Sequence, residues 1–103
     1  VVVVPDADQH PEQLVGLIDG VPIKYQFPRH PAASGVRVII PTLIDRRDVT
    51  SDGRIKQSNR EWIYRQAFHM GRHIIGYEVD KIEAAVAWLE KANADDRPIG
   101  LTG

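Results

Sequence analysis

The sequence predicts an α/β fold, a partial three-layer sandwich with a mainly parallel sheet. Two observations support this class. Runs of β-branched residues lie at 1–4 and 36–40, and another apolar run lies at 97–102. Helical periodicity separates these runs, so that strand and helix alternate along the chain. In such an alternation, helices cross over between parallel strands, and the carboxyl ends of the strands meet at one edge of the sheet.

The first predicted strand is Val1-Val2-Val3-Val4, and Pro5-Asp6 follows it as a turn. Four consecutive β-branched residues are typical of a strand buried on both faces. Residues 5–24 are rich in Pro, Gly and Asp, which predicts a loop with one helical turn near 12–16. Because no Met or charged leader precedes the first strand and a strand stands at each end, we expect residues 1–103 to be a single partial domain, truncated at both ends.

The next helix is expected within residues 25–34, with Gly35 as its C′ residue. Pro28 and Pro31 shorten it, because proline is tolerated only in the first turn of a helix. Residues 36–40 then form a strand that ends at Pro41. Residues 42–57 read as a long polar loop that contains the balanced charges of 45–48 and the turn signal Ser51-Asp52-Gly53.

A long helical segment follows Ser58, the predicted N-cap, with Glu61 three residues later as in a capping box. Apolar residues recur at helical spacing on two successive faces, and Gly71 and Gly76 weaken or break the helix between them. The first face holds Ile63, Ala67, Met70 and Ile74, and the second holds Val79, Ile82, Val86 and Leu89. The last predicted strand covers residues 97–102.

Composition excludes several classes of protein. The 103 residues are 43% hydrophobic and 26% charged, which is ordinary for a globular chain and unlike a disordered or collagenous one. A formal net charge of −1 lacks the basic excess of a nucleic-acid-binding protein. Cysteine is absent, which excludes disulfides, zinc–thiolate sites and a cysteine nucleophile. No apolar run approaches the roughly 18 residues of a membrane span.

Three local patterns carry candidate chemistry, and each has a simpler interpretation. Residues 6–10 (DADQH) alternate metal-ligating side chains, but they lack the glycine and glutamate of a calcium loop, so a solvated turn is favoured. His69 and His73 share a helix face without the intervening Glu of a metalloprotease motif, which favours a structural or surface pair. Arg60, Arg65 and Arg72 can bind an anion or simply form a charged helix face. We therefore expect no metal site and no cofactor.

Five stretches together resemble the α/β-hydrolase superfamily, in particular its branch of dienelactone hydrolases and acetyl xylan esterases. They are 1–9 (VVVVPDADQ), 36–46 (VRVIIPTLIDR), 60–68 (REWIYRQAF), 70–79 (MGRHIIGYEV) and 99–103 (IGLTG). The third and fourth are the most specific, because generic α/β patterning does not require them. The resemblance covers most of the chain except residues 10–34.

The resemblance implies a serine esterase that cleaves small-molecule carboxylic esters. The loop after the first strand would then be the oxyanion loop, with Asp6, Ala7 and Asp8 as candidates for the backbone donor. Gly103 would begin the nucleophile elbow G-x-S-x-G, whose serine stands two residues after the first glycine. The acid and the histidine follow the nucleophile in this fold, so the chain itself would hold no member of the triad and would be inactive alone.

Two alternatives remain open at the level of the sequence. The first is a non-catalytic relative of the hydrolases that binds a ligand without turnover. The second is a self-contained small α/β module that binds a ligand. The residue two positions after Gly103 distinguishes the esterase from the first alternative, and cooperative unfolding of the isolated chain would favour the second.

Overall fold

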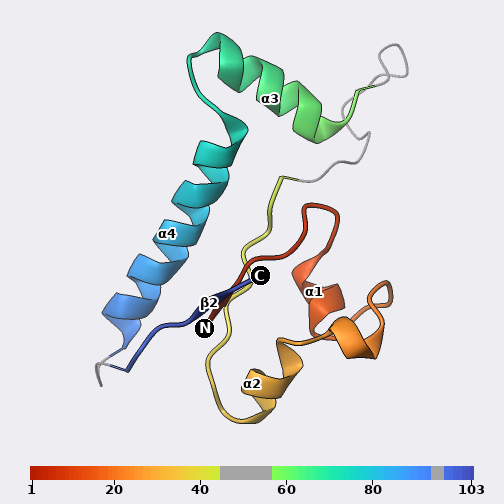
Figure 1. Ribbon diagram of the computed structural model, residues 1–103, viewed down its shortest axis with the longest axis vertical. Coiled ribbons are helices and arrows are strands. Elements are labelled where there is room, and N and C mark those ends of the chain that lie inside the picture. The colour runs from red at the N-terminus through yellow and green to blue at the C-terminus, as the bar shows by residue number, and fades with distance from the viewer. Residues whose placement is uncertain (45–56, 94–96) are drawn as a thin grey trace.

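A computed structural model describes residues 1–44, 57–93 and 97–103 of the chain (Figure 1). In order, the elements are β1 (Val2–Val3), α1 (Pro11–Leu14), the 3-10 helix η1 (Ile23–Tyr25), α2 (Arg29–Ala33), α3 (Asn59–His69), α4 (Ile74–Ala92) and β2 (Leu101–Thr102). The charged stretch 45–48 and the turn signal Ser51-Asp52-Gly53 lie outside the described residues.

The predicted three-layer α/β sandwich is wrong. About 48% of the described residues are helical, and they contain a parallel sheet of only two strands, β1 and β2. The predicted strand at 36–40 contributes a single isolated bridge, Val2↔Ile39, which is also parallel. Two-residue strands and one bridge are too little sheet for helices to form layers on both faces. The parallel direction, however, was predicted correctly, with Val2 opposite Leu101 and Val3 opposite Thr102.

The long helical segment forms two helices, because the chain turns at Gly71. That residue has a φ of +71°, a left-handed conformation in which glycine avoids the steric cost of a side chain. Ser58 caps α3 as predicted, since its Oγ accepts a hydrogen bond from Glu61 N at 3.2 Å. Gly76, by contrast, lies within α4 without ending it. Figure 1 shows α3 and α4 as two arms that meet at this corner.

The proline-containing region forms the short helix that the sequence predicts. Pro28 is the N-cap of α2, and Pro31 lies in its first turn, where a missing N–H has no cost. Gly35, with a φ of +81°, follows as the C′ residue, and Gly35 N donates to Ala32 O at 3.0 Å. This turn returns the chain toward β1.

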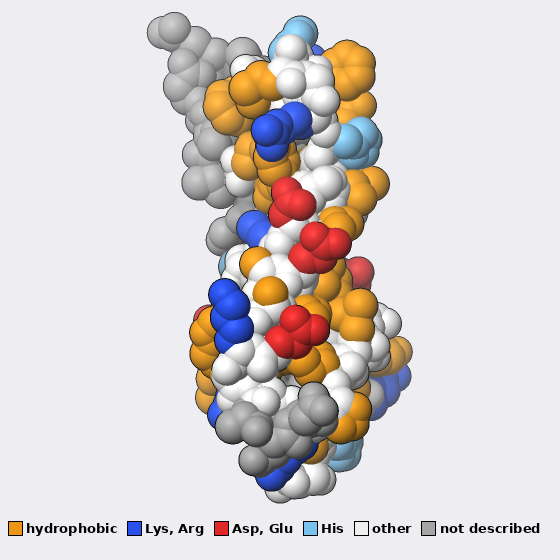
Figure 2. All heavy atoms as spheres, turned by 90° about the vertical axis from the view of Figure 1, so that its left-hand side faces the viewer, with side chains coloured by type: hydrophobic (Ala, Val, Ile, Leu, Met, Phe, Trp, Pro, Cys, Tyr) orange, Lys and Arg blue, Asp and Glu red, His pale blue; other side chains and the backbone are white. Residues whose placement is uncertain are grey.

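Few side chains are fully buried. Among the described residues, the buried apolar side chains other than proline are Val2, Val3, Leu14, Ala67, Ile74 and Leu89. Both valines of β1 are 0% exposed, as expected for a strand covered on both faces. Met70, predicted to lie on the buried face of its helix, is 68% exposed because it stands at the corner between α3 and α4. Figure 2 shows acidic side chains in a row along one face, with hydrophobic side chains exposed beside them. None of the described helices is long and apolar enough to cross a membrane.

Candidate functional site

The candidate site lies where three parallel chain segments end. β1 is the middle segment: Val3 N donates to Ile39 O at 2.8 Å on one side, and Val4 N donates to Thr102 O at 2.8 Å on the other. Because the segments run in the same direction, their carboxyl ends lie at a common edge. Ligand sites of α/β proteins form at such an edge.

Gly103, the predicted start of the nucleophile elbow, lies directly against the end of the first strand. A Cβ at this position would stand 3.2 Å from both the Cβ and the carbonyl oxygen of Val4. The close approach explains a glycine here, because a side chain would press on Val4, the residue that follows β1. The structure therefore brings Gly103, the predicted first residue of the elbow, beside Val4, which precedes the predicted oxyanion loop.

The predicted oxyanion loop forms a β-turn of residues 6–9, which we call the predicted oxyanion turn. Gln9 N donates to Asp6 O at 3.0 Å and closes the turn, and Asp6 N donates to Gln9 Oε1 at 3.2 Å. The N–H of Asp6 is thus already used. Among the described residues, the N–H of Ala7 makes no hydrogen bond, so Ala7 is a candidate whose donor is available. Asp6 and Asp8 are exposed, and Ala7 is half-buried.

An ion pair between α3 and α4 stands close to this turn. Arg60 donates through Nη1 to Glu78 Oε1 and through Nη2 to Glu78 Oε2, the latter at 2.9 Å. The two side chains are only 21% and 12% exposed, which favours a strong, ordered pair. The hydrogen bonds to Arg60 lower the pKa of Glu78, although its partial burial opposes this. The same bonds raise the pKa of Arg60, and the negative charge of Asp8 adds to that effect.

Two cationic side chains from these helices also bind the backbone that leaves the Ile39 bridge. Arg60 Nη1 donates to Ile44 O at 3.0 Å, and Lys81 Nζ donates to Thr42 O at 3.0 Å. The segment 42–44 is therefore held by α3 through one carbonyl and by α4 through another. Among the described residues, these two hydrogen bonds hold the segment that follows Ile39, which lies on the side of β1 away from β2.

The remaining predicted groups do not converge on the site. His69 ends α3 and His73 is the N-cap of α4, where its Nδ1 accepts a hydrogen bond from Ile75 N at 3.2 Å, so the two do not share a helix face as predicted. Arg65 pairs with Glu61 in the solvent, at 2.6 Å, apart from the Arg60 pair. Throughout the described ranges, no three His, Asp or Glu side chains gather in a group that could hold a metal ion.

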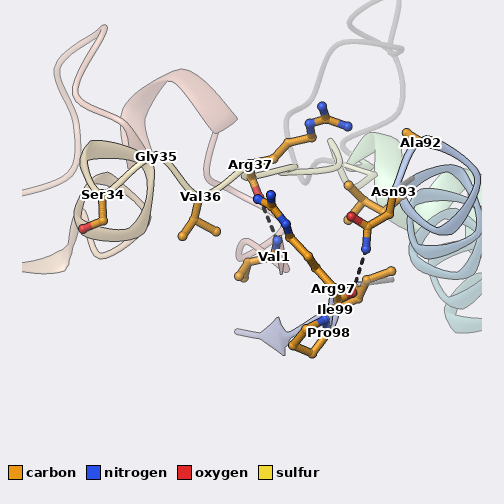
Figure 3. A pocket seen from close by; sticks show the side chains of 11 residues that line it. Val1, Ser34, Gly35, Val36, Arg37, Ala92, Asn93, Arg97, Pro98 and Ile99 are labelled. Carbon is orange, nitrogen blue, oxygen red and sulfur yellow. Dashed lines mark hydrogen bonds between the residues drawn. The ribbon is translucent and has the colours of Figure 1, made fainter. Parts of the chain in front are cut away.

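A separate cavity of about 610 Å³ lies near the starts of the same chain segments (Figure 3). Val1 N donates to Arg37 O at 2.7 Å at its wall, and Asn93 Nδ2 donates to Arg97 O at 2.6 Å. Figure 3 shows the side chain of Arg97 extending toward Val1. Because Val1 and Ile99 begin segments that end at Val4 and Gly103, the cavity lies away from the predicted oxyanion turn.

No protein-family model matches the chain, and comparisons with curated proteins and with solved structures gave no significant match. Any function of the chain must therefore be inferred from its own residues. The sequence did not indicate the Arg60–Glu78 pair, since the partners are 18 positions apart and belong to different helices. The only available signal was the glycine at 71, which allows the chain to fold back.

Proposed function

We propose that this chain is part of a serine esterase related to the α/β-hydrolase superfamily, acting on small-molecule carboxylic esters. The observation that carries the proposal is the close approach of Gly103 to Val4. An oxyanion hole in such an enzyme needs two backbone donors, one from the loop after a strand and one from the residue after the nucleophile. The approach of these two segments supports the proposal, because the two donors must reach one oxygen atom.

In this proposal the chain contributes an electrostatic function. Attack of a serine on the ester carbonyl places negative charge on the carbonyl oxygen, and the N–H of Ala7 donates a hydrogen bond to that oxygen. Such a donor acts more strongly on the transition state than on the substrate, so it raises kcat. The serine would stand two residues after Gly103, and the acid and histidine would follow it in the chain.

The first experiment tests the chemistry with the complete gene product. We expect hydrolysis of p-nitrophenyl acetate and covalent labelling by a fluorophosphonate at the serine two residues after Gly103. A protein that is folded, hydrolyses no ester and takes up no label would overturn the proposal.

A pair of variants at Ala7 tests the assigned donor. Ala7 is the second residue of the turn that begins at Asp6, a position that proline favours, so Ala7→Pro removes the N–H while remaining compatible with the turn. We expect kcat to fall by about 10²–10³-fold with little change in KM. Ala7→Ser keeps the N–H and is the matched control, for which we expect activity near that of the wild type. Equal activity of the two variants would exclude Ala7 as the donor.

A further inference from the structure

The edge that carries the predicted oxyanion turn is supported from one side by a network of charged side chains. Arg60 is at its centre, with three hydrogen bonds from one guanidinium: two to Glu78 on α4 and one to Ile44 O. Lys81, one turn after Glu78 on α4, adds the bond to Thr42 O. The network thus connects two helices to one stretch of backbone.

That stretch of backbone continues directly from the segment that pairs with β1. Ile39 uses both its N–H and its C=O toward β1, with Ile39 N to Val1 O at 2.9 Å and Val3 N to Ile39 O at 2.8 Å. Three to five residues later, the carbonyls of Thr42 and Ile44 are bound by the helices. The position of β1, and of the turn that follows it, is therefore linked to the helices through this segment.

The second link to the turn is electrostatic. Asp8 lies in the turn itself, and its negative charge contributes to the raised pKa of the Arg60 guanidinium. On α4, Glu78 binds Arg60 directly and the positive charge of Lys81 acts on Glu78, while the negative charge of Asp8 acts on Arg60 from the turn. An arginine suits this position because its planar group can bind a carboxylate with two nitrogens and still donate to a carbonyl, which a lysine ammonium cannot do in the same geometry.

We infer that Arg60 is a positioning residue for the predicted oxyanion turn, acting through Ile44 and Asp8 to hold the turn that contains Ala7. This inference rests on the proposed esterase function. Arg60 does not touch the ester in this account, and its effect is on the placement of the Ala7 N–H. A displacement of a donor by about 1 Å can reduce the rate by about 10²-fold.

The test compares three variants of the complete gene product. Arg60→Gln removes the charge and the paired geometry, Arg60→Lys keeps the charge alone, and Arg65→Gln removes the exposed pair with Glu61 as the matched control. For each we would measure kcat and KM with p-nitrophenyl acetate, thermal unfolding, and hydrogen–deuterium exchange of peptides covering residues 5–10 and 41–44.

We expect Arg60→Gln to lower kcat at least about tenfold with little change in KM, and to increase exchange at residues 5–10. Arg60→Lys should recover part of both effects, and Arg65→Gln should change neither. If Arg60→Gln fails to fold, the inference is tested by whether Arg60→Lys has a lower kcat and faster exchange at residues 5–10 than Arg65→Gln.

Three outcomes would overturn the inference. In the first, the Arg60 variants lose stability but keep wild-type kcat, which would mean a purely structural role. In the second, exchange at residues 5–10 matches that of the control. In the third, KM rises while kcat is unchanged. An inactive wild-type protein would instead refute the esterase, and the exchange data would still show whether Arg60 holds the turn.

Discussion

Gly103 and Gly100 differ at the scale of single residues, although they are two glycines of one short segment. A Cβ at Gly103 would meet Val4 at 3.2 Å, whereas a Cβ at Gly100 would meet only Val1 Cγ2, at 3.6 Å, an ordinary van der Waals distance. The neighbour at Gly103 includes backbone that is hydrogen-bonded to Thr102, so it cannot move away freely. A side chain at Gly103 therefore needs Val4 to shift slightly, whereas one at Gly100 does not press on its neighbour.

This difference predicts that alanine substitutions at the two glycines change stability to different extents. We expect Gly103→Ala to lower the free energy of unfolding of the complete gene product by about 1–3 kcal/mol, because the added methyl group overpacks β1. Gly100→Ala should change it by no more than about 1 kcal/mol, and in the stabilising direction, because alanine restricts the unfolded chain. Urea unfolding measures both. Equal effects of the two substitutions would contradict the assigned contact.

Residue roles were predictable where the signal was local. Ser58 as the N-cap of α3 and Gly35 after α2 follow from rules that span three or four residues. The pairing of Arg60 with Glu78 was not predictable, because it depends on how two helices meet. The preference for Ala7 over Asp6 among the three predicted candidates also needed the structure, since only the hydrogen bonds show that the N–H of Asp6 is already used.

At the scale of the elements, the corner at Gly71 brings the two helices together so that Arg60 can pair with Glu78. One continuous helix would have placed His69 and His73 on one face and kept Arg60 far from Glu78, which lies 18 residues, or about 27 Å, further along such a helix. Because the chain turns instead, the first turn of α3 comes beside the beginning of α4. The helical periodicity predicted the burial of Ala67, Ile74 and Leu89, but Met70 and Val79 of the same predicted faces are exposed, and the periodicity did not indicate the angle between the helices.

The ion pair that joins these helices predicts a pH dependence. Its hydrogen bonds lower the pKa of Glu78 in the folded protein below the ordinary value of about 4.3. The unfolded state therefore binds the proton more readily, so the stabilisation is present above about pH 4.3 and is lost as the pH falls through the lower, folded-state pKa. Arg60 remains charged throughout this range.

Glu78→Gln should remove this component of stability. We expect the variant to be less stable than the wild type by about 1–3 kcal/mol at pH 7, because Arg60 is left partly buried without its carboxylate. The difference should shrink as the pH falls below about 4.3, the ordinary pKa of a glutamate in the unfolded chain, and it is lost once the pH falls through the lowered pKa of folded Glu78. Chemical denaturation at pH 7 and pH 3 measures it, with Glu61→Gln as the control for an exposed pair. A difference that does not depend on pH would contradict this account.

At the scale of the whole molecule, the sequence predicted more sheet than the structure contains. The apolar runs at 36–40 and 97–102 have the composition of strands, but regular pairing needs neighbours along their whole length, and Val36 and Leu101 are 42% and 61% exposed. Strand propensity describes a residue's fit to a half-buried pleated surface. It cannot indicate how much of that surface the rest of this chain provides.

The shape of the molecule leads to a prediction about its folding. The radius of gyration of 16.1 Å exceeds the roughly 13 Å typical of a compact domain of about 100 residues, and the shortest dimension is 16 Å. Large apolar side chains such as Phe68, Met70 and Trp88 are 55% exposed or more. A molecule this thin buries little apolar surface, and this burial must offset the conformational entropy that 103 residues lose on folding.

We therefore expect the isolated 103-residue chain to retain helical far-ultraviolet circular dichroism but to unfold without a sharp transition. Dye binding to exposed apolar surface should accompany this state, and differential scanning calorimetry is the decisive measurement. A single cooperative calorimetric transition, with equal calorimetric and van't Hoff enthalpies, would mean that the chain is a self-contained module. It would then favour a small ligand-binding protein over the esterase, because a chain that completes its own fold does not need the segment that would carry the serine.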